Sequence, residues 1–155
     1  MSFFNTMNIA ATGLTAQRLR MDVIAENIAN VNTTRTADGG PYRRRTVLFQ
    51  EMRDHDPFSP ISINHVWSIN SDSRAPQGMG VRVAGVVTDN SPGLLTYDPT
   101  HPDADEYGYV RMPNVNIVEE MVNMISASRS YEANITAMSV ARTLTQRTLE
   151  IGQGR

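Results

Sequence analysis

The sequence predicts an α+β fold in which long N- and C-terminal helices pair as a coiled coil, with a small β-rich insert between them. Three observations carry this prediction: an apolar heptad repeat near the N-terminus, a second one near the C-terminus, and β-type alternation with turn signals between the two. We expect residues 1–34 and 115–155 to form the helical part and residues 35–114 to form the insert. The 155 residues are enough for one such unit.

The first heptad repeat advances in steps of three and four from Met7 to Val31. Such steps place side chains along one side of a helix, and a single helix cannot bury its own apolar stripe. We expect this helix to end between Asn30 and Thr34, because asparagine tolerates left-handed backbone and β-branched threonine disfavours helix. The positions of the repeat are Met7, Ala10, Leu14, Gln17, Met21, Ile24, Ile28 and Val31.

The middle of the chain reads as short extended segments separated by turns. Residues 42–52 are rich in strand-forming side chains, residues 61–67 alternate between apolar and polar, and residues 81–87 form the clearest strand pattern. Residues 107–110 are a shorter candidate, and Asn-Ser-Pro-Gly at 90–93 is a strong turn signal. An insert of this size is marginal as an independent core.

The second long helix is expected to begin near Asn116 and to end near Ile151. Asn116 followed by Glu119 resembles a capping box, and the glycine after Ile151 is a typical terminator. Its repeat consists of Ile117, Met121, Met124, Ser128, Tyr131, Ile135, Met138, Arg142, Thr145 and Leu149.

Additional apolar residues flank this second repeat on both sides, so the helix has two apolar faces and needs more than one partner helix. One partner is expected to be the first helix of the same chain, and the other a helix of another subunit. The flanking residues are Val118, Val122, Ile125, Ala137, Ala141, Leu144 and Ile151.

Charge and cysteine content exclude several classes of protein. The net charge of −2 and the single basic run at Arg43–Arg45 do not favour nucleic-acid binding. The absence of cysteine excludes disulfides, thiol catalysis and zinc–thiolate sites. No apolar run is long enough to span a membrane, and the N-terminus lacks the features of a cleaved secretory signal.

One cluster is metal-like at first sight, namely His101, Asp103 and Asp105. A proline interrupts it and no fourth ligand lies nearby, so we expect a turn in which aspartates cap backbone donors. The segment 54–56 is interpreted in the same way. Because there is also no phosphate-binding loop or nucleophile elbow, we expect no enzyme, no cofactor and no small-molecule substrate. A metal-dependent hydrolase using the three residues remains an alternative.

Two segments, Thr12–Gln17 and Arg20–Thr33, resemble the N-terminal signature of the flagellar axial proteins, which form the rod, the hook and hook-associated parts. Further segments narrow the resemblance to the short rod proteins of the basal body. These segments are Thr33–Thr36, Gly39–Arg44, Tyr97–Pro99, His101–Asp105, Gly108–Val110, Pro113–Asn116, Glu119–Met121 and Ala127–Asn134.

The resemblance implies a structural subunit of the proximal rod, part of the drive shaft that carries torque from motor to hook. It implies assembly with other copies of the chain, with other rod subunits and with the rod–ring adaptor at the membrane ring. It also implies passage through the flagellar type III export apparatus without a cleaved signal peptide, and a location in the basal body, periplasmic in a Gram-negative cell. A soluble coiled-coil adaptor or chaperone with a β-rich recognition insert is the alternative.

The candidate site residues on this reading are contacts between subunits. The apolar positions expected at the subunit interface are Met7, Leu14, Met21, Ile24, Ile28, Val31, Met121, Ile125, Tyr131, Ile135, Met138, Leu144 and Leu149. Side-chain hydrogen bonds from the first helix end to the following loop are expected from Asn27, Asn30 and Asn32. Candidates for ion pairs across subunits are Arg43, Arg44, Arg45 and Arg129.

Overall fold

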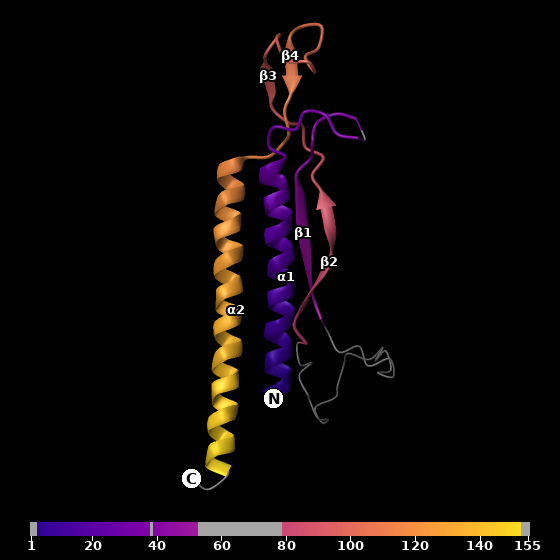
Figure 1. Ribbon diagram of the computed structural model, residues 1–155. Helices are drawn as coiled ribbons and strands as arrows, with labels where there is room; N and C mark the ends of the chain where they lie inside the picture. Colours follow the sequence, from indigo (N-terminus) through magenta and orange to yellow (C-terminus); the bar gives the residue numbers. More distant parts are fainter. Residues whose placement is uncertain (1–2, 38, 53–78, 153–155) are drawn as a thin grey trace, which may run out of the picture.

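Two long helices dominate the computed structural model, which describes residues 3–37, 39–52 and 79–152. Helix α1 (Phe3–Ala29) and helix α2 (Ile117–Gly152) lie side by side and run in opposite directions (Figure 1). At about 1.5 Å per residue, the 27 residues of α1 span about 40 Å and the 36 residues of α2 about 54 Å. The last turns of α2 therefore extend past the N-terminal end of α1 (Figure 1).

Both helix boundaries agree with the sequence prediction. Helix α1 ends one residue before Asn30. At the start of α2, the side-chain Oδ1 of Asn116 accepts a hydrogen bond from the backbone N–H of Val118 at 3.0 Å, which confirms Asn116 as the cap. The Glu119 carboxylate lies 3.6 Å from the guanidinium of Arg44, so it serves the packing between elements as well as the helix end.

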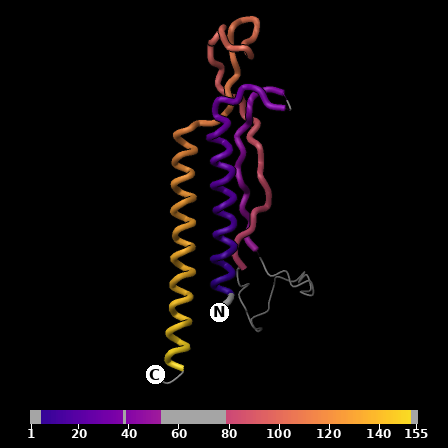
Figure 2. The backbone as a smooth tube through the Cα atoms, viewed as in Figure 1, coloured from indigo at the N-terminus to yellow at the C-terminus, as the bar shows by residue number. Residues whose placement is uncertain are grey.

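A two-stranded hairpin covers the other side of α1, so that α1 lies between α2 and the hairpin (Figure 2). Strands β1 (Arg45–Glu51) and β2 (Val81–Thr88) pair antiparallel, with a register shift between Leu48 and Phe49. These strands confirm the predicted extended segments at 42–52 and 81–87. The predicted strand at 61–67 and the acidic segment at 54–56 lie outside the described residues.

The hairpin is fastened to α1 near both of its ends. At the start of β2, the backbone N–H of Val81 donates to the Thr12 hydroxyl at 3.2 Å. At the start of β1, Arg45 Nη1 donates to Glu26 Oε1 at 2.7 Å. Val47 is the buried residue of β1, and it lies between these two attachments. The part of the insert formed by β1 and β2 therefore packs along α1.

A second, smaller hairpin forms the end of the molecule beyond the first residues of α2 (Figure 1). Strands β3 (Leu95–Tyr97) and β4 (Tyr109–Arg111) pair antiparallel in a sheet of their own. The predicted strand at 107–110 is confirmed with a shifted start, whereas β3 was not predicted. Gly93 precedes β3 at a place where a side chain cannot fit, because a Cβ there would lie 1.8 Å from the Met112 carbonyl oxygen.

The α+β class is confirmed, with terminal helices and small antiparallel strand pairs between them. Helix α2 contacts α1 through small residues: Ala127 is fully buried (0% exposed) and Ala141 is buried. A Cβ added at Gly13 of α1 would lie only 3.0 Å from the Asn134 amide. The helices therefore approach closely. The buried apolar residues of the described chain are Ala10, Ala16, Val23, Ile24, Tyr42, Val47, Val110, Ala127 and Ala141.

No helix among the described residues is long and apolar enough to cross a membrane.

Candidate assembly site

A buried polar cluster, which we call the junction, joins α1, α2 and β1. At its centre is Asn27, near the end of α1, with only 1% of its surface exposed. Its Nδ2 donates to Glu120 Oε2 at 2.8 Å and to the Arg45 carbonyl at 2.8 Å. Its Oδ1 accepts from the Tyr42 hydroxyl at 2.9 Å and from the Arg45 N–H at 3.0 Å. Both amide hydrogens and both lone pairs are used, so only this arrangement of the three elements satisfies Asn27.

Glu120 connects α2 to the same cluster and is also only 1% exposed. Its Oε1 accepts from Arg44 Nε at 2.8 Å and from Arg44 Nη2 at 2.6 Å. Burial lowers the pKa of Arg44, but the hydrogen bond and charge of Glu120 outweigh that effect and raise the pKa overall. Arg44 is therefore charged at any physiological pH, and its pairing with Glu120 fixes the first turns of α2 against the segment that leads into β1.

Two further residues complete the junction. Burial raises the pKa of the Tyr42 hydroxyl, and the charge of Glu26 adds to this rise, so Tyr42 remains a hydrogen-bond donor to Asn27. Asn114, just before α2, accepts from the backbone N–H of Arg44 at 2.8 Å and donates to the Asp89 carbonyl at 3.1 Å. The loop after β2 is thereby held to the same centre.

The residues predicted for helix-to-loop hydrogen bonds have different roles in the structure. Asn27 reaches across to two other elements, as described above. Asn30 bonds locally: its Nδ2 donates to the Glu26 carbonyl at 2.9 Å, and its Oδ1 accepts from the Thr33 hydroxyl at 3.1 Å. Asn32 is exposed.

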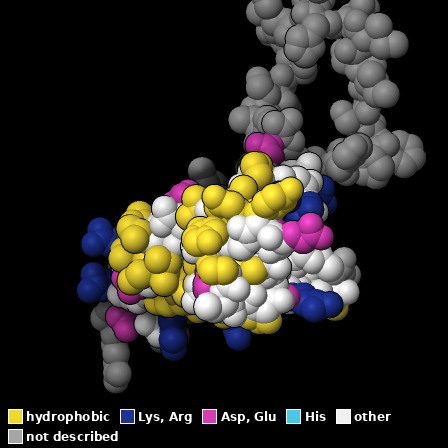
Figure 3. All heavy atoms as spheres, turned by 90° about the horizontal axis from the view of Figure 1, so that it is seen from above, with side chains coloured by type: hydrophobic (Ala, Val, Ile, Leu, Met, Phe, Trp, Pro, Cys, Tyr) yellow, Lys and Arg dark blue, Asp and Glu magenta, His cyan; other side chains and the backbone are white. Residues whose placement is uncertain are grey.

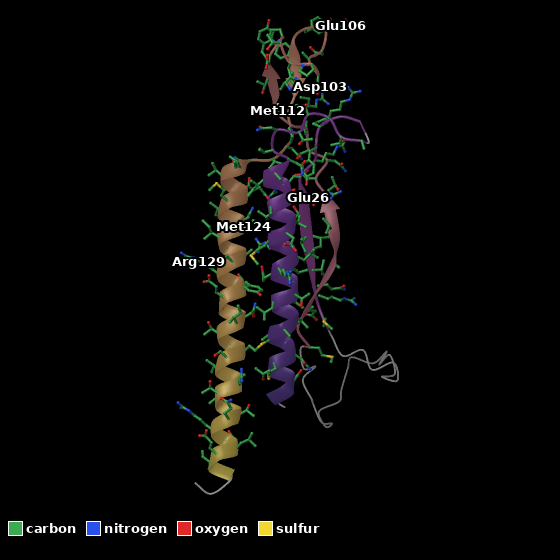
Figure 4. All side chains as sticks on the ribbon, viewed as in Figure 1. Glu26, Asp103, Glu106, Met112, Met124 and Arg129 are labelled. Atoms are coloured by element: carbon green, nitrogen blue, oxygen red, sulfur yellow. The ribbon has the colours of Figure 1, made fainter. Side chains whose placement is uncertain are left out.

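Two of the four candidate arginines pair within the chain. Arg44 pairs with Glu120, and Arg45 pairs with Glu26, so these two help to fix the fold of the single molecule. Arg43 donates to the Asn90 side chain in the neighbouring loop. Arg129 is exposed and points away from α1 (Figure 4), so it remains placed for a contact with another chain.

Sequence reasoning missed the importance of Glu120, which it included only within the segment Glu119–Met121. It also did not single out Tyr42 and Asn114. Their partners lie far away in the sequence: Glu120 and Arg44 are 76 residues apart, and Asn27 and Glu120 are 93 apart. The only local signal was Glu120 itself, a charged residue directly beside the apolar repeat of α2.

One face of the helix pair is apolar and uncovered, and we call it the apolar face. Asn27 contacts Glu120, and Gly13 lies against Asn134, which sets the level of the two helices. When two helices run antiparallel, the residue that follows each contact residue points toward the same side of the pair in both helices. The apolar face therefore brings Ile28 beside Met121 and Leu14 beside Ile135, with Met21 and Ile125 between these levels. The face consists of Met7, Leu14, Met21, Ile28, Met121, Ile125, Ile135 and Leu149.

Exposure differs between the two helices on this face. The four residues from α1 are half-buried, whereas the four from α2 are exposed, Ile125 by 56%. The face lies away from the hairpin, which covers the side of α1 that carries Ala16 and Val23. A third helix laid along this face would contact both α1 and α2.

The other predicted interface residues lie elsewhere. Ile24 is buried within the chain, and Val31 is half-buried in the turn after α1. Tyr131 and Met138 are half-buried on the row that alternates with Ala127 and Ala141 against α1, as is Met124, which lies between the helices in Figure 4. Leu144 is exposed on a different side of α2, together with Val140 and Ile151.

The segment 101–105 forms the predicted capped turn. The Asp105 carboxylate accepts from the backbone N–H groups of Tyr107 and Tyr109, each at 2.9 Å. Asp103 accepts from the Thr34 hydroxyl at 2.8 Å, and its own N–H donates to His101 Nδ1 at 3.1 Å. These contacts account for the three side chains as structural groups. No cluster able to hold a metal ion occurs among the described residues.

Comparison with known proteins points to one family. Residues 7–35 match the family described as flagella basal body rod protein, and residues 107–151 match the family described as flagellar basal body rod FlgEFG protein C-terminal. The chain is similar to proteins named flagellar basal-body rod protein FlgC, with 49% identity to that of Borreliella burgdorferi, 40% to that of Bacillus subtilis and 39% to that of Salmonella typhimurium. Each alignment covers 99% of this chain and 100% of the relative.

Proposed function

The chain belongs to the family of flagellar basal-body rod proteins and is a structural rod subunit, and we propose that it assembles by packing its apolar face against helices of neighbouring subunits in the proximal rod. The alternatives of a metal-dependent hydrolase and of a soluble adaptor are set aside, because the whole chain aligns with rod proteins. The two matched family segments contain most of α1 and α2, which are the helices that form the apolar face.

The apolar face is the observation that supports this proposal. Burying a large aliphatic side chain is worth about 1.5–3 kcal/mol, and the exposed Met121, Ile125, Ile135 and Leu149 gain this only when something covers them. Exposed apolar side chains repeated along one side of a helix pair mark an interaction site, and on α2 this row also includes Ser128 and Arg142. A helix is the natural occupant, because the face is as long as α1 and carries side chains at heptad spacing. In this arrangement α1, α2 and the neighbouring helices pair as a coiled coil.

Further parts of the proposal concern the assembled rod. The helical part, residues 1–34 and 115–155, forms the inner wall, and the insert, residues 35–114, forms the outer layer. Long helices packed laterally are stiff, which suits a shaft that transmits torque from the motor to the hook. The partners are other copies of the chain, other rod subunits and the rod–ring adaptor, with delivery by the type III export apparatus without a cleaved signal peptide. The site of assembly is periplasmic in a Gram-negative cell.

A substitution on the apolar face tests lateral packing. Ile125→Asp places a carboxylate where the proposal buries Ile125, and an unpaired buried charge costs about 3–5 kcal/mol. Because Ile125 is exposed in the single chain, the purified variant should keep its helix content and unfolding midpoint while incorporation into basal bodies and swimming are lost. Ser126→Asp adds the same charge at the exposed position next to Ile125, which is turned by about 100° away from the face, and should leave motility intact.

Ile28→Asp tests the same face from α1. It should abolish assembly while β1 and β2 keep their pairing, which hydrogen exchange of the hairpin amides reports. Normal motility in both Ile125→Asp and Ile28→Asp would contradict the proposal. If neighbouring helices cover the apolar face, it cannot accept an unpaired charge on either α1 or α2.

A further inference from the structure

The two ends of the molecule are both uncovered, and their charges complement each other. One end is the β3–β4 hairpin with the loop that connects its strands, which we call the tip. The other is the part of α2 beyond the N-terminal end of α1, residues 145–152, which we call the overhang. The tip and the overhang lie at opposite ends of the long axis (Figure 1). A contact between them can therefore form only between two molecules.

The tip carries an aromatic surface. Leu95, Tyr97 and Tyr109 occupy alternate positions of the paired strands and share one face, which is exposed, while Val110 on the opposite face is buried. The rings of Tyr97 and Tyr109 meet edge to face with centroids 5.3 Å apart. Tyr107, in the adjoining loop, is 79% exposed. Large exposed aromatic residues grouped in this way are typical of a binding surface.

The tip is also acidic. Four carboxylates lie between residues 98 and 106, against Arg111 and His101. Asp103 lies 3.8 Å from Arg35, and Asp98 faces His101. Glu106 stands at the extreme end of the molecule (Figure 4). Seen along the axis from this end, hydrophobic side chains gather on the surface, with acidic and basic side chains around them (Figure 3). The surface therefore suits a partner that is apolar and basic.

The overhang has that chemistry. Leu149 and Ile151 are exposed, Ile151 by 78%, and no helix of the described chain lies beside them. Arg147 lies within the overhang and Arg142 one turn before it, both exposed, against the single acid Glu150. From Arg142 to Gly152, two arginines stand against one glutamate, so this end of α2 presents aliphatic side chains with a net charge of +1.

We propose that the tip of one molecule binds the overhang of a second copy of this chain, end to end. The proposal rests on the proposed function only in treating the chain as a subunit of a stack. A tip-to-overhang contact joins two different surfaces and does not close, which is the contact that extends a filament along its axis. Tip-to-tip pairing is disfavoured because it brings acids together, and pairing of overhangs brings arginines together. The apolar face remains free for lateral neighbours.

Site-specific cross-linking tests the contact, because the chain contains no cysteine. The variants Tyr107→Cys and Ile151→Cys are purified separately, mixed and oxidised. We expect the mixture to give a cross-linked dimer at several times the yield of either variant alone. A mixture of Tyr107→Cys with Thr136→Cys, an exposed position in the middle of α2, serves as control and should give the background yield. Equal yields in the test and control mixtures, or a dominant product from Tyr107→Cys alone, would overturn the proposal.

Charge reversal adds a second test in the same assay. Placing Glu106→Arg in the Tyr107→Cys chain, or Arg147→Glu in the Ile151→Cys chain, should each lower the yield about two- to fivefold at low salt, and combining the two reversed chains should restore it. Failure of the combination to restore the yield counts against the contact. In basal bodies, a chain carrying both cysteines should give a ladder of multiples of itself. A cross-link from Tyr107→Cys to a different rod protein would show another occupant and refute the proposal, while the proposed rod function would stand.

Discussion

The two halves of α2 are built on opposite principles. In its first turns, Glu120 is buried and hydrogen-bonded to α1 and to the segment before β1. In its last turns, Leu144, Leu149 and Ile151 are exposed to solvent. The contact that the first turns of α2 make with α1 is thus polar and directional, whereas the apolar side chains of its last turns are left for other chains. A buried polar network allows few arrangements, whereas an apolar surface accepts any partner of suitable shape. The polar network fixes the shape of the single chain, and the apolar surface is available for assembly.

The largest expected effect on the free energy of unfolding comes from removing the Glu120 carboxylate from the junction. Glu120→Ala leaves one N–H of the buried Asn27 amide without a partner and leaves the half-buried Arg44 guanidinium with only the more distant Glu119, which should cost about 3 kcal/mol in free energy of unfolding. Glu119→Ala is the matched control, because that carboxylate is largely exposed and lies 3.6 Å from Arg44, and it should cost less than about 1 kcal/mol. Urea unfolding followed by circular dichroism measures both. Equal losses would show that the junction does not hold the fold.

The second prediction breaks the centre of the junction without changing its shape. Asn27→Asp replaces an amide donor by a carboxylate that faces the Glu120 carboxylate, so we expect a loss of about 1–3 kcal/mol at pH 7. Because two such carboxylates hold a shared proton more readily as the pH falls, the loss should shrink toward pH 4. Unfolding midpoints of the variant and the parent protein across this range measure the difference. A loss that stays constant with pH would mean that the two groups do not face each other.

The sequence predicted the elements better than it predicted their contacts. The ends of both helices, the Asn116 cap and the strands β1 and β2 follow from local signals, namely heptad steps, capping residues and β-branched alternation. Strand β3 has only three residues and shows no alternation of its own, so it exists mainly through pairing with β4. The junction could not be predicted, because nothing in the local pattern of residue 120 names a partner at residue 44.

The heptad repeats were informative in a way that the structure refines. Of the ten positions of the predicted α2 repeat, Met124, Tyr131 and Met138 lie toward α1, while Met121, Ile135 and Leu149 belong to the apolar face. The closest contacts with α1 come instead from small or polar residues of α2, which directly precede Met121, Ile135 and the other positions of that row in the sequence. Hydrophobicity indicates which side chains can be buried. Which element covers them depends on how closely two backbones can approach, and small residues such as Ala127 allow a close approach.

The third prediction compares the stability effects of two apolar substitutions, one in each half of α2. Ala127→Leu adds apolar atoms where there is no space, and should destabilise the single chain by about 1–3 kcal/mol. Leu144→Ala removes apolar atoms from an exposed position, and should change stability by less than about 0.5 kcal/mol. Thermal unfolding of the dilute protein measures both. A large loss for Leu144→Ala would show that the far half of α2 is already covered in the single chain.

The smallest expected effect concerns exposed turns, where hydrogen bonds act without burial. Thr100 donates two hydrogen bonds to the Asp98 carboxylate, and both lower the pKa of that carboxyl, the hydroxyl more than the backbone N–H. Ser91 lowers the pKa of Asp89 in the same way, with the backbone N–H having the larger effect and the hydroxyl the smaller. A lowered pKa means that the turn is stabilised above the ordinary pKa of about 3.9 and that this contribution is lost as the pH falls through the lowered value. In an NMR titration, the Thr100 amide should therefore shift only below the ordinary Asp range. Asp98→Asn keeps the acceptor but removes the titration, so the same amide should then stay unshifted. A Thr100 transition at the ordinary value would show that these bonds do not persist in solution, and that polar order in this chain is confined to its buried junction.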